Sequence, residues 1–251
     1  MSLLKKIHPE QPLKELRWFD IGIVTLIMFG QFIVRSTQMY LASLSPSLST
    51  AISETATNTA SEGAAYSSNF TLQIILLALA IIYLWIRHFD FKQLPIRLNW
   101  SVFWVPFIFA IMGLFADMVS TLSGQYNYFS PQVLAFISPM AVIDKFLALS
   151  PMAIAYGLLN GFYEEFFFLG LLTSVKDKYK WLVLLFSTII RVSFHTYQGM
   201  LWALVIGVAF GLLYYFLYKY KVKNLLPFFL VHALADMFGS SLIYLLVNWN
   251  Y

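Results

Sequence analysis

Long apolar segments, separated by short charged or polar loops, follow one another along almost the whole chain. A transmembrane helix needs about 20 consecutive apolar residues. About seven segments approach or exceed this length: Phe19–Leu41, Phe70–Ile86, Ser101–Leu122, Ser150–Leu172, Trp181–His195, Gly199–Tyr218 and Leu225–Val247. The apolar region Ser130–Leu149 contains two prolines, Asp144 and Lys145, so it is predicted to be an interfacial or re-entrant segment, or else an eighth helix. The pattern predicts an all-α, polytopic bundle of about seven or eight transmembrane helices.

Composition excludes several classes of protein. The chain of 251 residues is 60% hydrophobic and 11% charged, with a mean hydropathy of +0.73. About a quarter of the residues of a soluble domain are charged, so this is a membrane protein. The absence of cysteine excludes disulfides, thiol nucleophiles and cysteine-ligated metals. The N-terminal apolar stretch is too long for a cleavable signal peptide and has no small-residue cleavage pattern.

Lysine and arginine in the short loops predict the orientation. With a cytoplasmic N-terminus, 13 of the 16 basic residues lie on the cytoplasmic side. These are Lys5, Lys6, Lys14, Arg17, Arg87, Lys92, Arg97, Lys176, Lys178, Lys180, Lys219, Lys221 and Lys223. The net charge of +4 thus reflects topology and gives no reason to expect nucleic acid as a partner. The segment 43–69 has no basic residue and is predicted to be a flexible extracytoplasmic loop.

One integral membrane domain is expected. Residues 1–149 would supply N-terminal transmembrane helices, and residues 150–251 would supply core helices that carry every polar motif described below.

Polar residues lie inside three of these apolar segments. Glu164 and Glu165 lie within the fourth, His195 ends the fifth, and His232 and Asp236 lie within the seventh. An ionisable group in a bilayer costs several kcal/mol unless it is paired or faces a wet cavity. At 1.5 Å per residue, Glu164, His195, His232 and Asp236 lie roughly 14 to 22 Å from the cytoplasmic helix ends, near the middle of a core about 30 Å thick. This common depth predicts a buried reaction centre.

The spacing of these groups indicates activation of water. His232 and Asp236 are four residues apart, as are Arg191 and His195, so each pair shares a helix face. A carboxylate and an imidazole can deprotonate and orient a water, and further polar groups can stabilise an oxyanion. The chain has no G-x-S-x-G and no H-E-x-x-H motif. A metal held by glutamate and histidine stays stereochemically open. The alternative for His195 is a hydrogen bond between helices, and for His232 with Asp236 it is a self-satisfied pair within one helix. Asp117, alone in its span, is interpreted as a packing or partner contact.

Three motifs in order resemble the CAAX protease and bacteriocin-processing family (CPBP, also called Abi), which contains intramembrane endopeptidases. The family pattern is Glu-Glu-x-x-x-Arg, Phe-x-x-x-His and His-x-x-x-Asn/Asp. It is matched by Glu164-Glu165, by His195 in RVSFHTYQG and by His232-Ala-Leu-Ala-Asp236. The resemblance covers about Ser150–Gly239. It implies that Glu164 and His195 activate a water, that His232 and Asp236 stabilise the oxyanion, and that Glu165 supports the site.

The resemblance further implies a peptide or membrane-protein substrate and a multi-pass protein of a bacterial cell membrane. Peptide maturation, bacteriocin immunity or signalling is expected rather than processing of prenylated proteins. No cofactor is expected. If a divalent metal such as zinc is bound, Glu164, His195 and His232 would hold it.

The chain departs from the family pattern at two positions. Leu169 stands where the family has arginine, and Arg191 stands where it has phenylalanine. One interpretation is a relocated charge, because Arg191 lies one turn before His195 and would join the site. The other is loss of activity, which would leave a membrane scaffold that regulates a partner membrane protein such as a sensor kinase. A transporter is a third class, but it explains neither the three motifs nor the absence of internal repeats.

Overall fold

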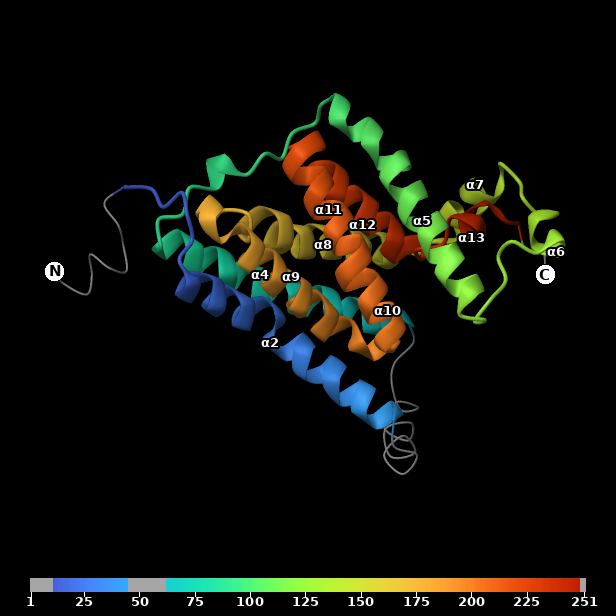
Figure 1. Cartoon of the computed structure of the whole chain (residues 1–251), viewed down its shortest axis with the longest axis horizontal. Coiled ribbons are helices and arrows are strands. Elements are labelled where there is room, and N and C mark those ends of the chain that lie inside the picture. The colour runs from blue at the N-terminus through green and yellow to red at the C-terminus, as the bar shows by residue number, and fades with distance from the viewer. Residues whose placement is uncertain (1–10, 45–61, 249–251) are drawn as a thin grey trace. The chain divides into compact units, whose positions relative to one another are not determined.

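The computed structural model describes residues 11–44 and 62–248 (Figure 1). Within these ranges the regular structure is helical, with two isolated β-bridges and no strand. The prediction of an all-α fold is confirmed. Lys5, Lys6 and most of the predicted loop 43–69 lie outside the described residues.

The chain forms two compact units, each built from two separate stretches of sequence. Unit 1 comprises Met1–Ile96 and Tyr163–Leu225, and unit 2 comprises Arg97–Phe162 and Leu226–Tyr251. One helix, α8 (Pro151–Glu165), begins in unit 2 and ends in unit 1. The predicted grouping of residues 1–149 and 150–251 within one domain stays a prediction.

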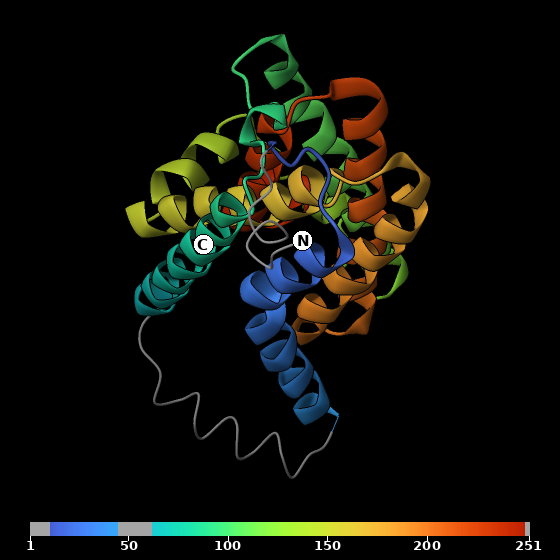
Figure 2. The ribbon, with the colours of Figure 1, turned by 90° about the vertical axis from the view of Figure 1, so that its left-hand side faces the viewer.

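Unit 1 is built around two long helices and the segments that pack on them. In order it contains α2 (Trp18–Ser43), α4 (Glu62–Ile86), the π-helix η3 (Phe166–Leu171), α9 (Lys180–His195), the 3-10 turn η5 (Thr196–Gln198), α10 (Met200–Leu204), the π-helix η6 (Val205–Phe210), α11 (Gly211–Leu217) and the π-helix η7 (Tyr218–Val222). In Figures 1 and 2 α2 runs beside α9, and α2 also packs against α4.

Aromatic side chains form the centre of unit 1. The ring of Phe29 on α2 lies 4.8 Å from that of Phe167 and 4.9 Å from that of Phe194, measured between centroids. The Phe166–Phe168 run is at most 3% exposed, so it packs between helices and does not face lipid. These contacts hold η3 and α9 against α2.

A buried ion pair joins α2 to the end of α4. Nε of Arg87 donates to Oδ1 of Asp20 at 2.6 Å, and the Tyr83 hydroxyl donates to the same oxygen at 2.7 Å. Burial alone would lower the pKa of Arg87, but the hydrogen bond and charge of Asp20 raise it above its ordinary value. The guanidinium therefore stays charged and paired.

Unit 1 also contains the 3-10 turns η1 (Phe91–Gln93) and η4 (Asp177–Tyr179), and unit 2 contains the remaining helices. They are the 3-10 helix η2 (Trp100–Phe103), α5 (Trp104–Leu122), α6 (Pro131–Leu134), α7 (Ala141–Ala148), α8 up to Phe162, α12 (Leu226–Phe238) and α13 (Leu242–Leu246). α5 packs against both α12 and α13. Asp117 on α5 is fully buried and accepts hydrogen bonds from the Ser241 hydroxyl and, at 2.9 Å, from the backbone N–H of Ile243. Its predicted role as a packing contact is confirmed, because it anchors the start of α13.

Four described helices are long and apolar enough to cross a bilayer: Trp18–Ser43, Ala65–Ile86, Trp100–Leu122 and Met200–Val222. A fifth candidate consists of Ala141–Ala148 and Pro151–Leu171, which meet at 100° as a broken span or a re-entrant loop. α9 and α12 have 16 and 13 residues. Length and apolarity thus give four or five spans, and the count of seven or eight crossings stays a prediction.

Two predicted boundaries were wrong. The loop 43–69 was predicted to reach Asn69, but α4 already begins at Glu62. Helix propagation costs little once a strongly apolar helix has formed, and Ala64 and Ala65 favour it. The last predicted span, Leu225–Val247, is broken after Phe238 because Gly239 has φ 78°, a left-handed conformation that ends a helix.

The packing of α8 on α12 within unit 2 depends on glycine. A Cβ atom placed on Gly161 would lie 2.4 Å from the backbone oxygen of Phe229 and 2.8 Å from the nitrogen of Ala233. Such distances mean that two helix backbones are in direct contact, as small residues permit in membrane proteins.

Gly161→Ala is expected to lower the thermal stability of the protein in detergent. The added methyl group would force two backbones apart, at a cost of about 1–3 kcal/mol. Gly22→Ala is the matched control, because a Cβ atom there meets nothing within 4 Å and alanine favours a helix. Thermal unfolding followed by circular dichroism measures both. An unchanged midpoint for Gly161→Ala would show that the two helices are not packed this closely.

Candidate active site

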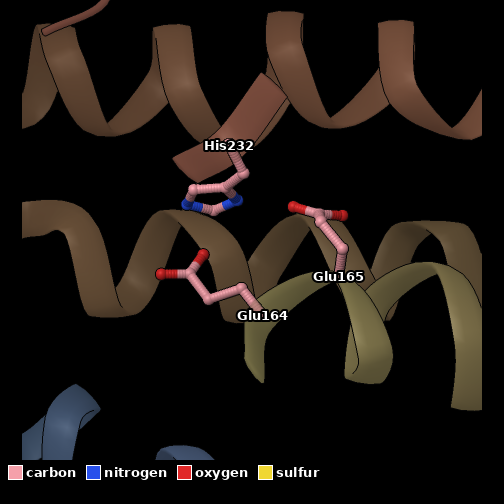
Figure 3. A group of neighbouring side chains, drawn as sticks. All are labelled: Glu164, Glu165 and His232. Carbon is pink, nitrogen blue, oxygen red and sulfur yellow. The ribbon is translucent and has the colours of Figure 1, made fainter. Parts of the chain in front are cut away.

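Two buried carboxylates lie at the C-terminal end of α8. Glu164 is 5% exposed and Glu165 is fully buried. Figure 3 shows that their carboxylates leave α8 in different directions, as expected for adjacent helical residues, which differ by about 100°. The partner that the structure shows for Glu165 lies on α9.

Glu165 is paired with Arg191. Oε2 of Glu165 lies 2.5 Å from a terminal guanidinium nitrogen of Arg191 on α9, with the two side chains 0% and 4% exposed. The guanidinium also lies 3.9 Å from the centroid of the Phe168 ring, at cation–π distance. A charge pair this deeply buried depends on both of its members, because removal of either charge leaves the other uncompensated.

Gly211 on α11 provides space for Arg191. A Cβ atom on Gly211 would lie 3.2 Å from Cδ of Arg191, closer than ordinary van der Waals contact. The arginine side chain therefore lies across the backbone of α11 on its way to Glu165.

His195 ends α9 and is held in one tautomer. Its Nδ1 atom lies 2.8 Å from the backbone oxygen of Arg191. A carbonyl oxygen only accepts, so Nδ1 carries the proton and Nε2 is the acceptor nitrogen of the neutral ring. The residue is 6% exposed, and its ring centroid lies 4.1 Å from that of Phe194. Nε2 is thus the ring atom that can accept a proton from water.

The end of α9 is fixed to α2 by a hydroxyl pair. The Ser36 and Thr196 hydroxyls are 2.9 Å apart, and the backbone N–H of Tyr197 donates to the Ser36 hydroxyl at 2.9 Å. These bonds hold the backbone that immediately follows His195.

In unit 2, His232 and Asp236 face each other across one turn of α12. Nε2 of His232 lies 3.9 Å from Oδ1 of Asp236, an ion-pair distance that is longer than a hydrogen bond. Oδ2 of Asp236 accepts a hydrogen bond of 2.9 Å from Nδ2 of Asn160 on α8. Asn160, 7% exposed, was missed by the sequence analysis. Its place four residues before Glu164 in an apolar helix was the signal that could have found it.

A π-helix follows Glu165 directly. The N–H of Leu172 bonds to the oxygen of Phe167 at 2.9 Å, five residues back. Segments of this kind are rare and often lie at functional sites. The π-helix includes Leu169, which is 2% exposed and stands where the resembled family has arginine.

Each unit brings together part of the predicted site. In unit 1 the side chain of Arg191 pairs with Glu165, and the backbone carbonyl oxygen of Arg191 accepts a hydrogen bond from His195. Glu164 is the sequence neighbour of Glu165. In unit 2 His232, Asp236 and Asn160 are grouped. The convergence of both groups on one reaction centre stays a prediction.

The apolar helices and the carboxylates, imidazoles and guanidinium buried among them are those of an integral membrane protein with a candidate hydrolytic centre. Residues 145–238 match the family model described as "Type II CAAX prenyl endopeptidase Rce1-like". This match agrees with the resemblance seen in the three motifs, and the matched segment contains every predicted site residue. No curated protein and no solved structure matches the chain.

Proposed function

We propose that the protein is an intramembrane endopeptidase that hydrolyses a peptide bond with a water activated by Glu164 and His195. The observation that carries the proposal is the arrangement in unit 1, where a buried carboxylate at Glu164 adjoins a neutralised Glu165–Arg191 pair and Arg191 fixes the tautomer of His195. The family match supports the same reaction class.

In the first step, Glu164 accepts a proton from the water, which Nε2 of His195 orients by accepting a hydrogen bond from its other O–H. The hydroxide oxygen bonds to the carbonyl carbon, and the carbonyl electron pair moves to its oxygen. Collapse of this intermediate breaks the C–N bond, and the proton on Glu164 passes to the leaving amine. Glu165 stays paired with Arg191 throughout and keeps the local charge balanced.

We assign His232 to the oxyanion. Its imidazole would donate to the developing charge, while Asp236, held by Asn160, orients it. Helix geometry supports this assignment: Gly161 precedes Glu164 and Glu165 by three and four residues, on the same face of the continuous α8. Within unit 2, a Cβ atom on Gly161 would lie 3.3 Å from Cβ of His232. Figure 3 draws Glu164, the proposed base, together with Glu165 and with His232, the proposed oxyanion donor.

A divalent cation such as zinc is the alternative to a metal-free site. Carboxylate and imidazole are ligands that zinc accepts, and Nε2 of His195 keeps its lone pair when Nδ1 carries the proton. Glu164, His195 and His232 would hold the ion, which would lower the pKa of a bound water. We favour the metal-free scheme, because a glutamate and a histidine suffice to activate water.

A scaffold that binds a partner membrane protein is the second candidate, and Leu169 is the observation that favours it. The pairing of Arg191 with Glu165 weighs against it, because the buried acid has a countercharge from α9 even though Leu169 cannot supply one.

The decisive assay uses the purified full-length protein in liposomes with a panel of membrane-anchored peptides, including a prenylated CAAX peptide. At least one peptide is expected to be cut at a single bond, as read by mass spectrometry of the products. Prior treatment with a chelator should leave the rate unchanged for a metal-free site and abolish it for a metal-dependent one. If the wild-type protein cuts no peptide, or gives the same products as the Glu164→Gln variant, the endopeptidase proposal is wrong.

A cytoplasmic N-terminus is part of the proposal. Because the chain has no cysteine, single cysteines can be introduced directly at exposed Gln125, after α5, and at exposed Lys178, before α9. An impermeant thiol reagent applied to intact cells should label position 125 and not position 178. Labelling of both positions, or of position 178 alone, would contradict the orientation.

A further inference from the structure

Unit 2 contains a cavity of about 580 Å³ that none of the proposed catalytic residues lines. It lies between α7, α13 and the loop that follows α5, elements that lie at one end of unit 2 in Figure 1. Tyr126, Tyr128 and Tyr244 supply aromatic walls, and Asp144, Lys145 and Asn248 supply polar groups. In the proposed orientation this end faces the extracytoplasmic side.

Lys145, the cationic side chain that lines the cavity, already has partners within the protein. Nζ of Lys145 donates to the backbone oxygen of Val247 and lies 4.8 Å from the centroid of the Tyr244 ring. Because Lys145 is also only partly exposed, its charge is turned toward the protein. An anionic ligand would meet the carboxylate of Asp144 and gain little from this lysine.

The groups that face the solvent suit a positive charge. Tyr126 and Tyr244 are 42% and 41% exposed, and Asp144 is exposed. Nδ2 of Asn248 donates to Oδ2 of Asp144 at 3.1 Å, which orients a carboxylate that can accept further hydrogen bonds. Aromatic faces beside a carboxylate bind guanidinium groups through cation–π contact and charge-assisted hydrogen bonds.

We propose that this cavity binds an arginine side chain of a peptide, with the guanidinium between the tyrosine rings and its charge on Asp144. The inference deepens the proposed function and rests on it: the arginine would belong to the extracytoplasmic flank of the membrane-anchored substrate. The site would then select substrates by a basic residue outside the bilayer, away from the bond that is cut. Arginine fits better than lysine because its planar guanidinium both stacks on tyrosine and pairs with a carboxylate.

The test measures binding without turnover, in full-length Glu164→Gln protein in detergent. The probes are the peptide acetyl-Gly-Arg-Gly-amide and its citrulline counterpart, which has the same shape and no charge. Saturation-transfer NMR and calorimetric titration should show binding of the arginine peptide about tenfold or more tighter than that of the citrulline peptide. Equal binding of the two would overturn the proposal and leave the tyrosines as interfacial anchors.

Variants of the lining residues give a second criterion. Asp144→Asn and Tyr244→Leu should each weaken arginine binding about tenfold, whereas Tyr244→Phe should keep it because the ring is retained. Asp177→Asn, at a carboxylate 70% exposed in unit 1, is the matched control and should have no effect. Unchanged binding in Asp144→Asn would also overturn the proposal. Arginine binding without any cleavage by wild-type protein would refute the endopeptidase alone, and cleavage without arginine preference would refute this site alone.

Discussion

Glu164→Gln is expected to reduce kcat/KM for peptide cleavage by at least about 10²-fold, because glutamine cannot accept the proton of the attacking water. His195→Ala should give a comparable loss, since it removes the ring that orients the same water. The double variant should be scarcely worse than either single variant, because the two residues act on one step. Initial rates with a peptide that the wild-type protein cuts measure all three.

Glu15→Gln, at an exposed glutamate in the same chain, is the matched control and should leave the rate unchanged. Thermal unfolding must confirm that each variant stays folded. Full cleavage by a folded Glu164→Gln protein would remove this residue from the mechanism. A scaffold makes the opposite prediction in cells: both substitutions should leave the phenotype and partner binding unchanged.

Arg191→Leu is expected to destabilise the protein by about 3–5 kcal/mol, because it leaves the fully buried carboxylate of Glu165 without its countercharge. Cleavage should weaken as well, because the uncompensated carboxylate of Glu165 would then lie next to Glu164, the proposed base. Glu165→Leu combined with Arg191→Leu should recover part of the stability, because neither charge is then left alone. Thermal unfolding of the two single variants and the double variant measures this coupling.

The rescue experiment returns the arginine to its family position. Arg191→Phe with Leu169→Arg should restore part of the activity that Arg191→Phe loses, because the new guanidinium starts one turn after Glu165. If Arg191→Leu is as stable and as active as the wild type, the ion pair has no role in either property. If the charge swap restores nothing, position 169 cannot reach the acid from within the π-helix.

The sequence alone was enough to predict the helical class and most helix positions. Bilayer thickness sets a minimum length for apolar segments, so hydropathy finds them directly. The break after Phe238 was harder to foresee, although Gly239 and the two serines after it were visible. It depends on the left-handed glycine and on Ser241, whose hydroxyl accepts from the N–H of Tyr244 at 2.9 Å.

Sequence patterns did not predict which residues pair between helices. The spacing of Arg191 and His195 predicted that they share a face, but nothing in it revealed that Glu165 receives the guanidinium. The bond of Asn160 to Asp236 likewise joins positions 76 residues apart. Such contacts depend on tertiary packing, which leaves no periodic pattern in a single sequence.

The small residue at Gly211 has an evolutionary consequence. An arginine at position 191 pairs with the acid at 165 and passes close to position 211, where a Cβ atom would lie 3.2 Å from its Cδ atom. Lineages that carry the arginine on α9 are therefore expected to keep glycine at 211, whereas those with arginine at 169 are free to vary there.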